Sequence, residues 1–176
     1  IIDESFKVFV TEPGEENKSI NTVQKIWQKL SENEFTRKSL IINLGGGLVC
    51  DLGGFAASTF KRGVSYINIP TTVLAQADAS VGGKTGFNFN SLKNEIGVFN
   101  KPERIFITDI FLDTLSKREF LSGFAEMLKH ALIYDEEHLN ELLSFYKSFT
   151  EKNSLEGFDE LMKKTVNIKK HFVEKD

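Results

Sequence analysis

The sequence has a single cysteine, no excess of basic residues and no long hydrophobic run, and each absence excludes a class of protein. Cys50 has no second cysteine to pair with, which is typical of proteins in a reducing compartment. The 22 lysines and arginines are scattered and are balanced by 25 acidic residues, so we expect no nucleic-acid partner. The apolar stretches fall far short of the roughly 20 residues that cross a bilayer. We therefore expect a soluble, cytoplasmic protein with no membrane partner.

What is present is an ordinary globular composition, 40% hydrophobic, in which strand-like and helix-like patterns alternate. Short β-branched or alternating runs predict strands over residues 7–10, 39–44, 66–69 and 104–108. Apolar residues at helical spacing predict helices over residues 20–30, 48–60 and 72–81. This alternation is typical of an α/β fold with a mostly parallel sheet and helices on both faces.

The second part of the chain has a different texture, with helical spacing throughout and no strand pattern. It predicts helices over residues 120–133, 137–149 and 155–172. We expect a Rossmann-like α/β domain over residues 1–112 and the start of an all-helical domain over residues 113–176. Because the chain opens on a strand pattern without Met, and because three helices make a small core, we expect both domains to be truncated.

Three glycines mark the junction of a predicted strand and helix. Gly45-Gly46-Gly47 exposes backbone amides at a helix N-terminus, where a phosphate can bind, and Asp51 follows one turn later. The alternative is a tight turn with a solvated aspartate, since the pattern is not the G-x-G-x-x-G fingerprint. Thr71 and Thr72 end the next strand, where open α/β sheets bind ligands, or they serve as helix caps.

A glycine-rich segment follows Asp78 and has the composition of a functional loop. Glycines surround Lys84 in the stretch 82–86, which indicates a backbone that approaches a ligand closely. Arg62 precedes this segment and Lys93-Asn94 follows it, so a phosphorylated or carboxylated substrate would suit the collected cations. Each cation taken singly is more often a surface charge.

One predicted helix places three chemically active side chains on the same surface. Glu126, Lys129 and His130 are spaced at i, i+3 and i+4, so Glu126 is a candidate metal ligand or acid–base group. A surface salt bridge explains the same spacing. His138 and His171 are the other histidines, and no H-E-x-x-H or C-x-x-C pattern completes a metal site.

Taken in order, these motifs resemble the 3-dehydroquinate synthases, a family of sugar-phosphate cyclases. The segments that carry the resemblance are Gly45–Phe55, Lys61–Gly63, Pro70–Thr72, Gln76–Asn88, Lys93–Gly97 and Ala125–Lys129. The resemblance extends over roughly residues 12–175, which corresponds to about the middle half of a family member.

The resemblance implies sites for NAD, for a seven-carbon phosphorylated keto acid and for a divalent metal. The positions that match NAD-binding residues are Glu15, Lys18, Gly45, Gly46, Gly47, Asp51, Thr71, Thr72, Lys93 and Thr114. The positions that match substrate-binding residues are Arg62, Asp78, Lys84, Asn94 and Lys129, of which Lys84, Asn94 and Lys129 are also the candidate catalytic residues. Glu126 matches the first of three zinc or cobalt ligands.

The chemistry that the resemblance implies is transient oxidation of the substrate by NAD, phosphate elimination, re-reduction and an aldol closure to 3-dehydroquinate. The family's other two metal ligands are histidines beyond the matching end of the chain, so we expect an incomplete metal site and no activity in the chain alone. Full-length members of the family are expected to be homodimers.

Three other interpretations stay open at this point. A related cyclase of the 2-deoxy-scyllo-inosose synthase type shares the triple glycine and Glu126, although residues 82–86 match the dehydroquinate branch better. A polyol dehydrogenase of the glycerol-dehydrogenase type would have the same architecture and would release NADH. A nucleotide-binding module without catalysis would not need Lys84, Asn94 or Lys129 to bind its ligand.

Overall fold

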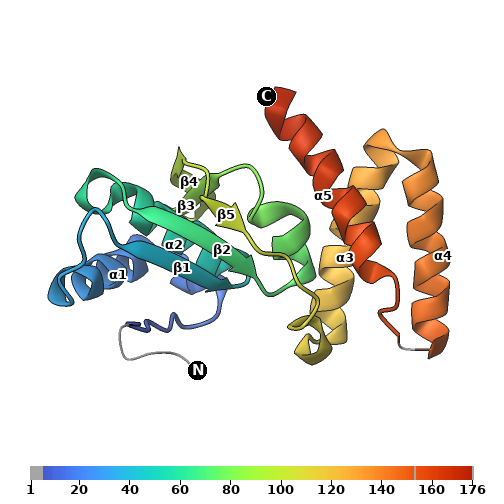
Figure 1. Cartoon of the computed structure of the whole chain (residues 1–176), viewed down its shortest axis with the longest axis horizontal. Helices are drawn as coiled ribbons and strands as arrows, with labels where there is room; N and C mark the ends of the chain where they lie inside the picture. Colours follow the sequence, from blue (N-terminus) through green and yellow to red (C-terminus); the bar gives the residue numbers. More distant parts are fainter. Residues whose placement is uncertain (1–5, 153, 176) are drawn as a thin grey trace.

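A computed structural model describes residues 6–152 and 154–175, and it divides into a strand-containing part and a bundle of helices (Figure 1). The elements in chain order are η1 (Glu15–Asn17), α1 (Ile20–Glu32), β1 (Leu40–Gly45), α2 (Gly47–Thr59), η2 (Phe60–Arg62), β2 (Ser65–Pro70), η3 (Ala75–Ala79), β3 (Lys84–Phe89), β4 (Leu92–Phe99), β5 (Arg104–Ile105), η4 (Leu112–Thr114), α3 (Lys117–Tyr134), α4 (Glu136–Lys152) and α5 (Phe158–Lys175).

The parallel sheet has the strand order β1-β2-β5, which confirms the predicted α/β architecture. β1 and β2 are in register from Leu40 opposite Ser65 to Gly45 opposite Pro70. Helices α1 and α2 pack on one face of the sheet around a core that includes Val23, Leu52 and Phe55. The predicted strand over residues 104–108 forms only as the two residues of β5.

The opposite face of β1 is open, so the expected cover of helices on both faces is absent there among the described residues. Leu40, Ile42 and Leu44 are exposed, whereas Asn43 points to the covered face and is buried. Side chains alternate along a strand, and only one set of them meets a helix here. The reason is that no described segment returns across this face.

The predicted strand over residues 7–10 is wrong, because this segment is extended but is not part of a sheet. Val8 and Val10 are exposed, and no described strand lies beside the segment to accept its hydrogen bonds. An alternating pattern gives a strand only where a neighbour completes the ladder.

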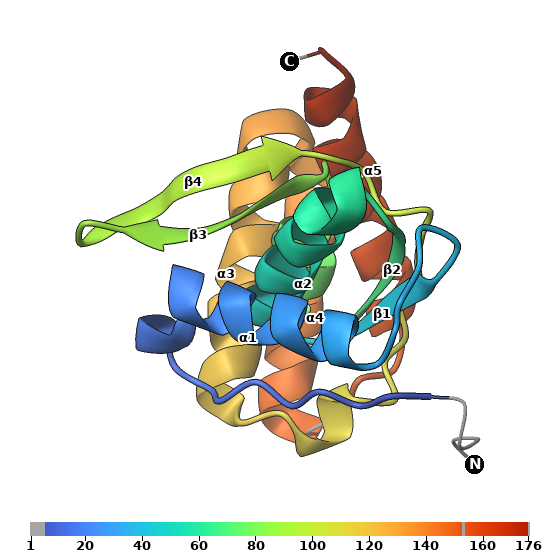
Figure 2. The same ribbon diagram turned by 90° about the vertical axis from the view of Figure 1, so that its left-hand side faces the viewer.

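The glycine-rich segment turns into the antiparallel β3–β4 hairpin, which projects from the body of the molecule (Figure 2). The sequence pattern had predicted a loop here. Gly86 and Gly97 face each other across the two strands, and a Cβ on Gly86 would lie 2.3 Å from the carbonyl oxygen of Ile96. Gly82 and Gly83 have positive φ at the turn into β3. Part of the glycine content thus serves strand pairing instead of ligand approach.

The three predicted C-terminal helices are confirmed as α3, α4 and α5, with bounds that differ by a few residues. Their core includes stacked aromatic rings, with Phe120 and Phe149 centroids 4.6 Å apart. Val73 and Ala77 from the segment around η3 belong to the same core. η3 is a π-type turn, shorter than the predicted helix over residues 72–81, and it ties the bundle to the α/β part.

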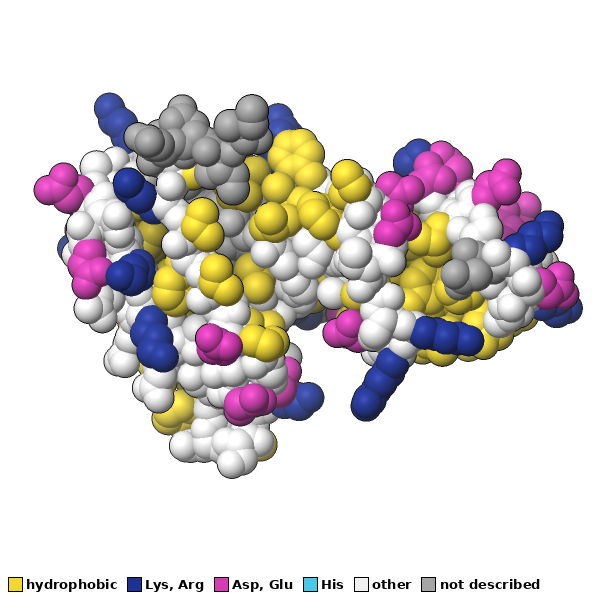
Figure 3. Space-filling model, turned by 90° about the horizontal axis from the view of Figure 1, so that it is seen from below, with side chains coloured by type: hydrophobic (Ala, Val, Ile, Leu, Met, Phe, Trp, Pro, Cys, Tyr) yellow, Lys and Arg dark blue, Asp and Glu magenta, His cyan; other side chains and the backbone are white. Residues whose placement is uncertain are grey.

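No helix of the described residues is long and apolar enough to cross a membrane. Acidic and basic side chains are intermingled on the face seen in Figure 3, so this face has no field of one charge sign.

Candidate active site

The triple-glycine turn joins β1 to α2 and lies against the segment that follows β2. A Cβ on Gly46 would lie 3.3 Å from Thr72 Cγ2, and one on Gly47 would lie 3.3 Å from the Cβ of Ala79. Thr71 donates its backbone N–H to the carbonyl of Gly45 at 2.9 Å. The structure therefore brings the two predicted nucleotide-binding segments together at the carboxyl ends of β1 and β2, where α/β sheets bind ligands.

Thr72 also acts as a helix cap, which was the alternative interpretation of this residue. Its Oγ1 accepts a hydrogen bond from the backbone N–H of Ala75 at 3.2 Å. The hydroxyl lies at the start of the helical turn that leads into η3. Capping and ligand binding by the same residue are compatible, because a hydroxyl offers a donor as well as two acceptor lone pairs.

Lys18 is the centre of a buried polar network at the start of α2. Its ammonium group lies 2.5 Å from Asp51 Oδ2 and also donates to Asn94 Oδ1. The Lys18 side chain is only 8% exposed, so it is almost fully removed from water. Burial raises the pKa of the Asp51 carboxyl, and the hydrogen bond and charge of Lys18 oppose that rise without cancelling it.

Asn88 extends this network to Glu15 and Lys93. It donates from Nδ2 to Glu15 Oε1 at 2.9 Å, and Lys93 Nζ lies 3.7 Å from the same carboxylate oxygen. A cavity of about 320 Å³ lies between the loop 15–19 and the hairpin, lined in part by Glu15, Lys18, Asn88 and Lys93. We call Glu15, Lys18, Asp51, Asn88 and Asn94 the Lys18 network.

A second cluster forms where η3 meets the helical bundle. Oxygen and nitrogen atoms of Asp78, Glu126 and His130 all lie within 4.8 Å of one another. His130 Nε2 is 3.4 Å from Glu126 Oε1 and 3.9 Å from Asp78 Oδ1. Carboxylates and imidazoles are donor types that a divalent metal accepts, so Glu126 fits the metal that the resemblance implies, with Asp78 and His130 beside it.

Two lysines balance the carboxylates of this cluster. Lys169 on α5 lies 2.5 Å from Asp78 Oδ1, and Lys129 donates to Glu126 Oε1. We call Asp78, Glu126, Lys129, His130 and Lys169 the Glu126 cluster. A metal ion at these oxygens would compete with both ammonium groups. The two groups of residues are neighbours, because Ala79, next to Asp78, lies against Gly47 at the start of α2, the helix that carries Asp51.

His130 is almost fully buried, and burial is the main cause that lowers its pKa. The charge of Lys129 lowers it further, while Glu126 and Asp78 oppose the shift. A lowered pKa favours the neutral imidazole, which is the form that binds a metal. Its Nδ1 atom and the hydroxyl of Ser80 are buried without a hydrogen-bond partner among the described residues.

Arg62, Thr114 and Lys84 are predicted site residues that belong to neither group and lie outside the triple-glycine turn. Arg62 is exposed in η2 at a φ of 69°, and its guanidinium has no ion-pair partner in the described part of the chain. Thr114 is exposed in η4 and donates to the carbonyl of Phe111 at 3.2 Å. Lys84 begins β3, with its Nζ 5.8 Å from the ring centroid of Phe99. Among the described residues, Arg62 and Thr114 are not brought together with the others.

Sequence reasoning missed two residues that the structure places in the site. Lys169 reaches Asp78 from α5, a distant part of the sequence, and no spacing rule connects them. Asn88 lies within the motif that resembles the family, but nothing in its neighbours indicated that it bonds Glu15. The helical spacing of Glu126 and His130 is also typical of a surface salt bridge, whereas His130 is buried.

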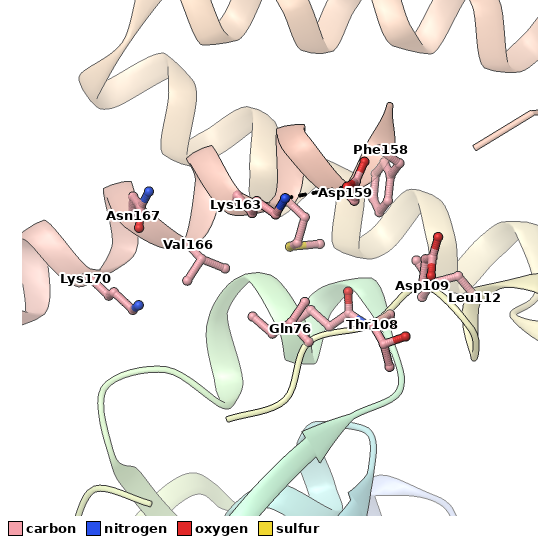
Figure 4. A pocket seen from close by; sticks show the side chains of 12 residues that line it. Gln76, Thr108, Asp109, Leu112, Phe158, Asp159, Lys163, Val166, Asn167 and Lys170 are labelled. Carbon is pink, nitrogen blue, oxygen red and sulfur yellow. Dashed lines mark hydrogen bonds and ion pairs between the residues drawn. The ribbon is translucent and has the colours of Figure 1, made fainter. Parts of the chain in front are cut away.

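A further cavity of about 520 Å³ lies between α5 and the loop after β5 (Figure 4). Gln76 lines it, and its amide donates to the carbonyl oxygens of Thr108 and Pro70. Met162 and Val166 contribute apolar walls, and none of the predicted site residues lines it. It is therefore separate from the two groups of residues described above.

Solved structures identify the fold as that of NAD- and metal-binding cyclases and of alcohol dehydrogenases. The 2-epi-5-epi-valiolone synthase ValA from Streptomyces hygroscopicus, solved with NAD+ and Zn2+ bound, aligns over 89% of this chain and 44% of its own, with a TM-score of 0.84 and 31% identity. Glycerol dehydrogenase from Schizosaccharomyces pombe aligns over 87% of this chain and 44% of its own, with a TM-score of 0.65. Its identity of 16% supports a shared fold and nothing more.

The chain belongs to the 3-dehydroquinate synthase family, since the N-terminal model of that family matches residues 8–122. It is 46% identical to a 3-dehydroquinate synthase from Parabacteroides distasonis over 172 residues, which are 96% of this chain and 47% of that protein. It is 47% identical to the one from Clostridium tetani over 98% of this chain and 46% of that protein. The chain spans about half the length of the curated relatives it matches.

Proposed function

We propose that the whole protein to which this chain belongs is a 3-dehydroquinate synthase. It would convert 3-deoxy-D-arabino-heptulosonate 7-phosphate to 3-dehydroquinate and phosphate. The observation that carries this proposal is the proximity of the Lys18 network and the Glu126 cluster, in a chain whose relatives bear that name over almost all its length. A cyclase of this type needs a dinucleotide and a metal beside one substrate.

The Lys18 network supports dinucleotide binding. Glu15 and Lys18 line the cavity of about 320 Å³, and the triple-glycine turn presents helix amides to a phosphate. Asp51 and Thr71 complete the candidate NAD-binding set on the sheet side, together with Gly45, Gly46, Gly47, Thr72, Lys93 and Thr114. When bound, NAD supplies reversible hydride transfer.

The Glu126 cluster supports a divalent metal, for which we propose zinc or cobalt. Glu126 would be one ligand, with Asp78 and His130 beside it and further ligands from the rest of the whole protein, and the metal when bound would supply Lewis-acid polarisation of a substrate oxygen. Asp78 matches a substrate-binding position, so its carboxylate would contact the substrate next to the metal. The neutral form of His130 is favoured by burial, so this side chain adds no charge next to the two lysines.

The cations of the site would neutralise the substrate. Lys129 and Lys169 both belong to the Glu126 cluster, and Lys84 and Asn94 lie on the β3–β4 hairpin. An anionic substrate would compete with the protein's carboxylates for the lysine ammonium groups. Ion pairs with those ammonium groups would hold the phosphate and the carboxylate of the substrate at fixed points. Arg62 would have to turn inward to join them. Fixing one substrate conformation is the main contribution that such a set makes.

The proposal is tested by phosphate release from the seven-carbon phosphorylated keto acid, with NAD and zinc or cobalt. The whole protein and this chain are assayed side by side. Release that depends on NAD and metal, with 3-dehydroquinate as the product, supports the proposal. Release without NAD, or net accumulation of NADH from a polyol, would point to a different enzyme.

The related cyclases are separated by their substrates in the same assay. The chain is 31% identical to a 2-deoxy-scyllo-inosose synthase, which aligns over 69% of this chain with a TM-score of 0.66. Phosphate release from a hexose 6-phosphate, and not from the seven-carbon acid, would favour that branch. The family resemblance also leads us to propose a homodimer, which light scattering of the whole protein tests.

A further inference from the structure

Asn88 bonds both to a residue on the nucleotide side and to a residue on the substrate side of the site. It lies in β3 between the pairs Phe87–Ile96 and Phe89–Leu92, where it stands opposite residues 93–95, so the irregularity is a bulge in β4. The extra residues of a bulge leave the regular ladder, and Asn94 is among them. The backbone N–H of Asn88 donates to the carbonyl of Lys18 at 2.9 Å instead of to a strand.

The two ends of the Asn88 amide face different segments. Nδ2 donates to Glu15 Oε1 at 2.9 Å, and Oδ1 accepts the backbone N–H of Asn94 at 2.9 Å. Asn94 has a φ of 53°, a left-handed conformation that a non-glycine residue holds only where its surroundings fix it. The bond from Asn88 fixes that backbone, while Lys18 bonds the Asn94 side chain.

We propose that Asn88 is a positioning residue that couples dinucleotide binding at Glu15 and Lys18 to substrate binding at Asn94. The inference rests on the proposed function, which assigns those residues to NAD and to the phosphorylated substrate. A dinucleotide that orders the loop 15–18 also orders Asn94 through Asn88, so each ligand strengthens the binding of the other. Such coupling is reciprocal for equilibrium binding.

The test exploits the two ends of the amide. Asn88→Asp keeps an oxygen to accept the Asn94 N–H, but places a second carboxylate oxygen against Glu15. NAD is titrated into the whole enzyme, and we expect Asn88→Asp to weaken its binding about tenfold, since a lost bond to a charged group is replaced by repulsion. Asn140→Asp, on the exposed surface of α4, adds the same charge and serves as the control.

A second background separates positioning from a general structural role. In the double variant Glu15→Gln/Asn88→Asp, the amide at position 15 can donate to the carboxylate at position 88, so the pair is restored with donor and acceptor exchanged. Adding Asn88→Asp to Glu15→Gln should then weaken NAD binding less than about threefold. A purely structural defect would weaken NAD binding by the same factor whether or not Glu15→Gln is present.

Coupling itself is measured by initial rates. In the unsubstituted enzyme the KM for NAD should fall as the phosphorylated keto acid is raised, and Asn88→Ala should remove that dependence. If the unsubstituted enzyme fails to bind NAD, the proposed function is wrong. If it binds NAD and the Asn88→Asp variant binds NAD within about twofold of the Asn140→Asp variant, the proposed role of Asn88 is wrong and the proposed function stands. The same conclusion follows if Asn88→Asp weakens NAD binding by the same factor in the Glu15 and the Glu15→Gln backgrounds.

Discussion

The Lys18 network and the Glu126 cluster differ in how completely their polar groups are paired. Lys18, buried in the α/β part, bonds two partners, and Asn88 uses both ends of its amide. In the Glu126 cluster, which brings together η3, α3 and α5, His130 Nδ1 has no hydrogen-bond partner in the described residues. The named polar groups of the nucleotide side are therefore paired with one another, whereas the metal side keeps unsatisfied groups.

The difference has a physical origin in how each group is assembled. The Lys18 network joins a loop, α2 and a hairpin that surround one core. The Glu126 cluster depends on packing between η3 and the bundle, where Gly123 admits the backbone of Leu74 and Val73. Buried polar groups without partners are costly, and they are found where a ligand or ion completes the bonding. Four substitutions, with their controls, measure how far the two groups differ.

The largest effect is expected for Glu126→Gln. Removing the charged ligand should weaken zinc binding by the whole enzyme on the order of 100-fold, with a matching loss of turnover, while NAD affinity stays unchanged. Metal titration and NAD titration on the same samples measure this, with Glu151→Gln on exposed α4 as the control. An equal loss of NAD affinity would show that the two groups of residues are not separable.

Lys18→Met should be the most destabilising of the remaining changes, by about 3 kcal/mol at pH 7, because it leaves Asp51 buried and unpaired. Burial raises the pKa of Asp51, so the folded protein binds that proton more tightly than the unfolded chain. The stability that protonation contributes is present at low pH and is lost as pH rises through the raised pKa. Removing Lys18 raises that pKa further.

The loss in free energy of unfolding caused by Lys18→Met should therefore be smaller at about pH 5 than at pH 7. Denaturant unfolding at both pH values measures it. Lys18→Met/Asp51→Asn, which has no charge to bury, should recover most of the loss. A deficit that is the same at both pH values, or that persists in the double variant, would mean that Lys18 acts through packing alone.

Gly123→Ala tests the junction that builds the Glu126 cluster. A Cβ at this position would lie 2.3 Å from the backbone nitrogen of Leu74, which cannot move aside as a flexible side chain does. We expect a loss of about 2 kcal/mol and weaker metal binding, because α3 must shift from η3. Ser122→Ala on the exposed side of α3 is the matched control. Unchanged metal affinity would show that the cluster tolerates movement of α3.

The smallest effect is expected for Lys169→Met, which removes the ion pair with Asp78. Its side chain is 24% exposed, against 8% for Lys18, and the loss of stability should be under about 1 kcal/mol. Lys164→Met removes a solvent-exposed pair with Glu141 on the neighbouring helix α4 and should cost less still. Denaturant unfolding of the three lysine variants ranks them. A Lys169 variant as unstable as Lys18→Met would remove the contrast between the two groups.

The ordered motifs carry the family resemblance, whereas local patterns along the chain were enough to predict the α/β architecture and the three C-terminal helices. These depend on apolar periodicity, β-branched runs and glycine at turns, and a single chain displays all three. The same signals failed over residues 7–10, because a strand also needs a neighbour, and over β3 and β4, because the glycines indicated a loop.

Which side chains meet depends instead on how the elements pack in three dimensions. Asp78 and Lys169 are far apart in sequence, and His130 is buried beside Glu126 although the helical spacing alone favours a surface pair. Asn88 reaches Glu15 because β3 lies beside the loop 15–18, and the bulge in β4 places Asn94 against the same amide. Contacts of this kind form between whole elements, where burial and charge balance are set by neighbours that no local pattern encodes.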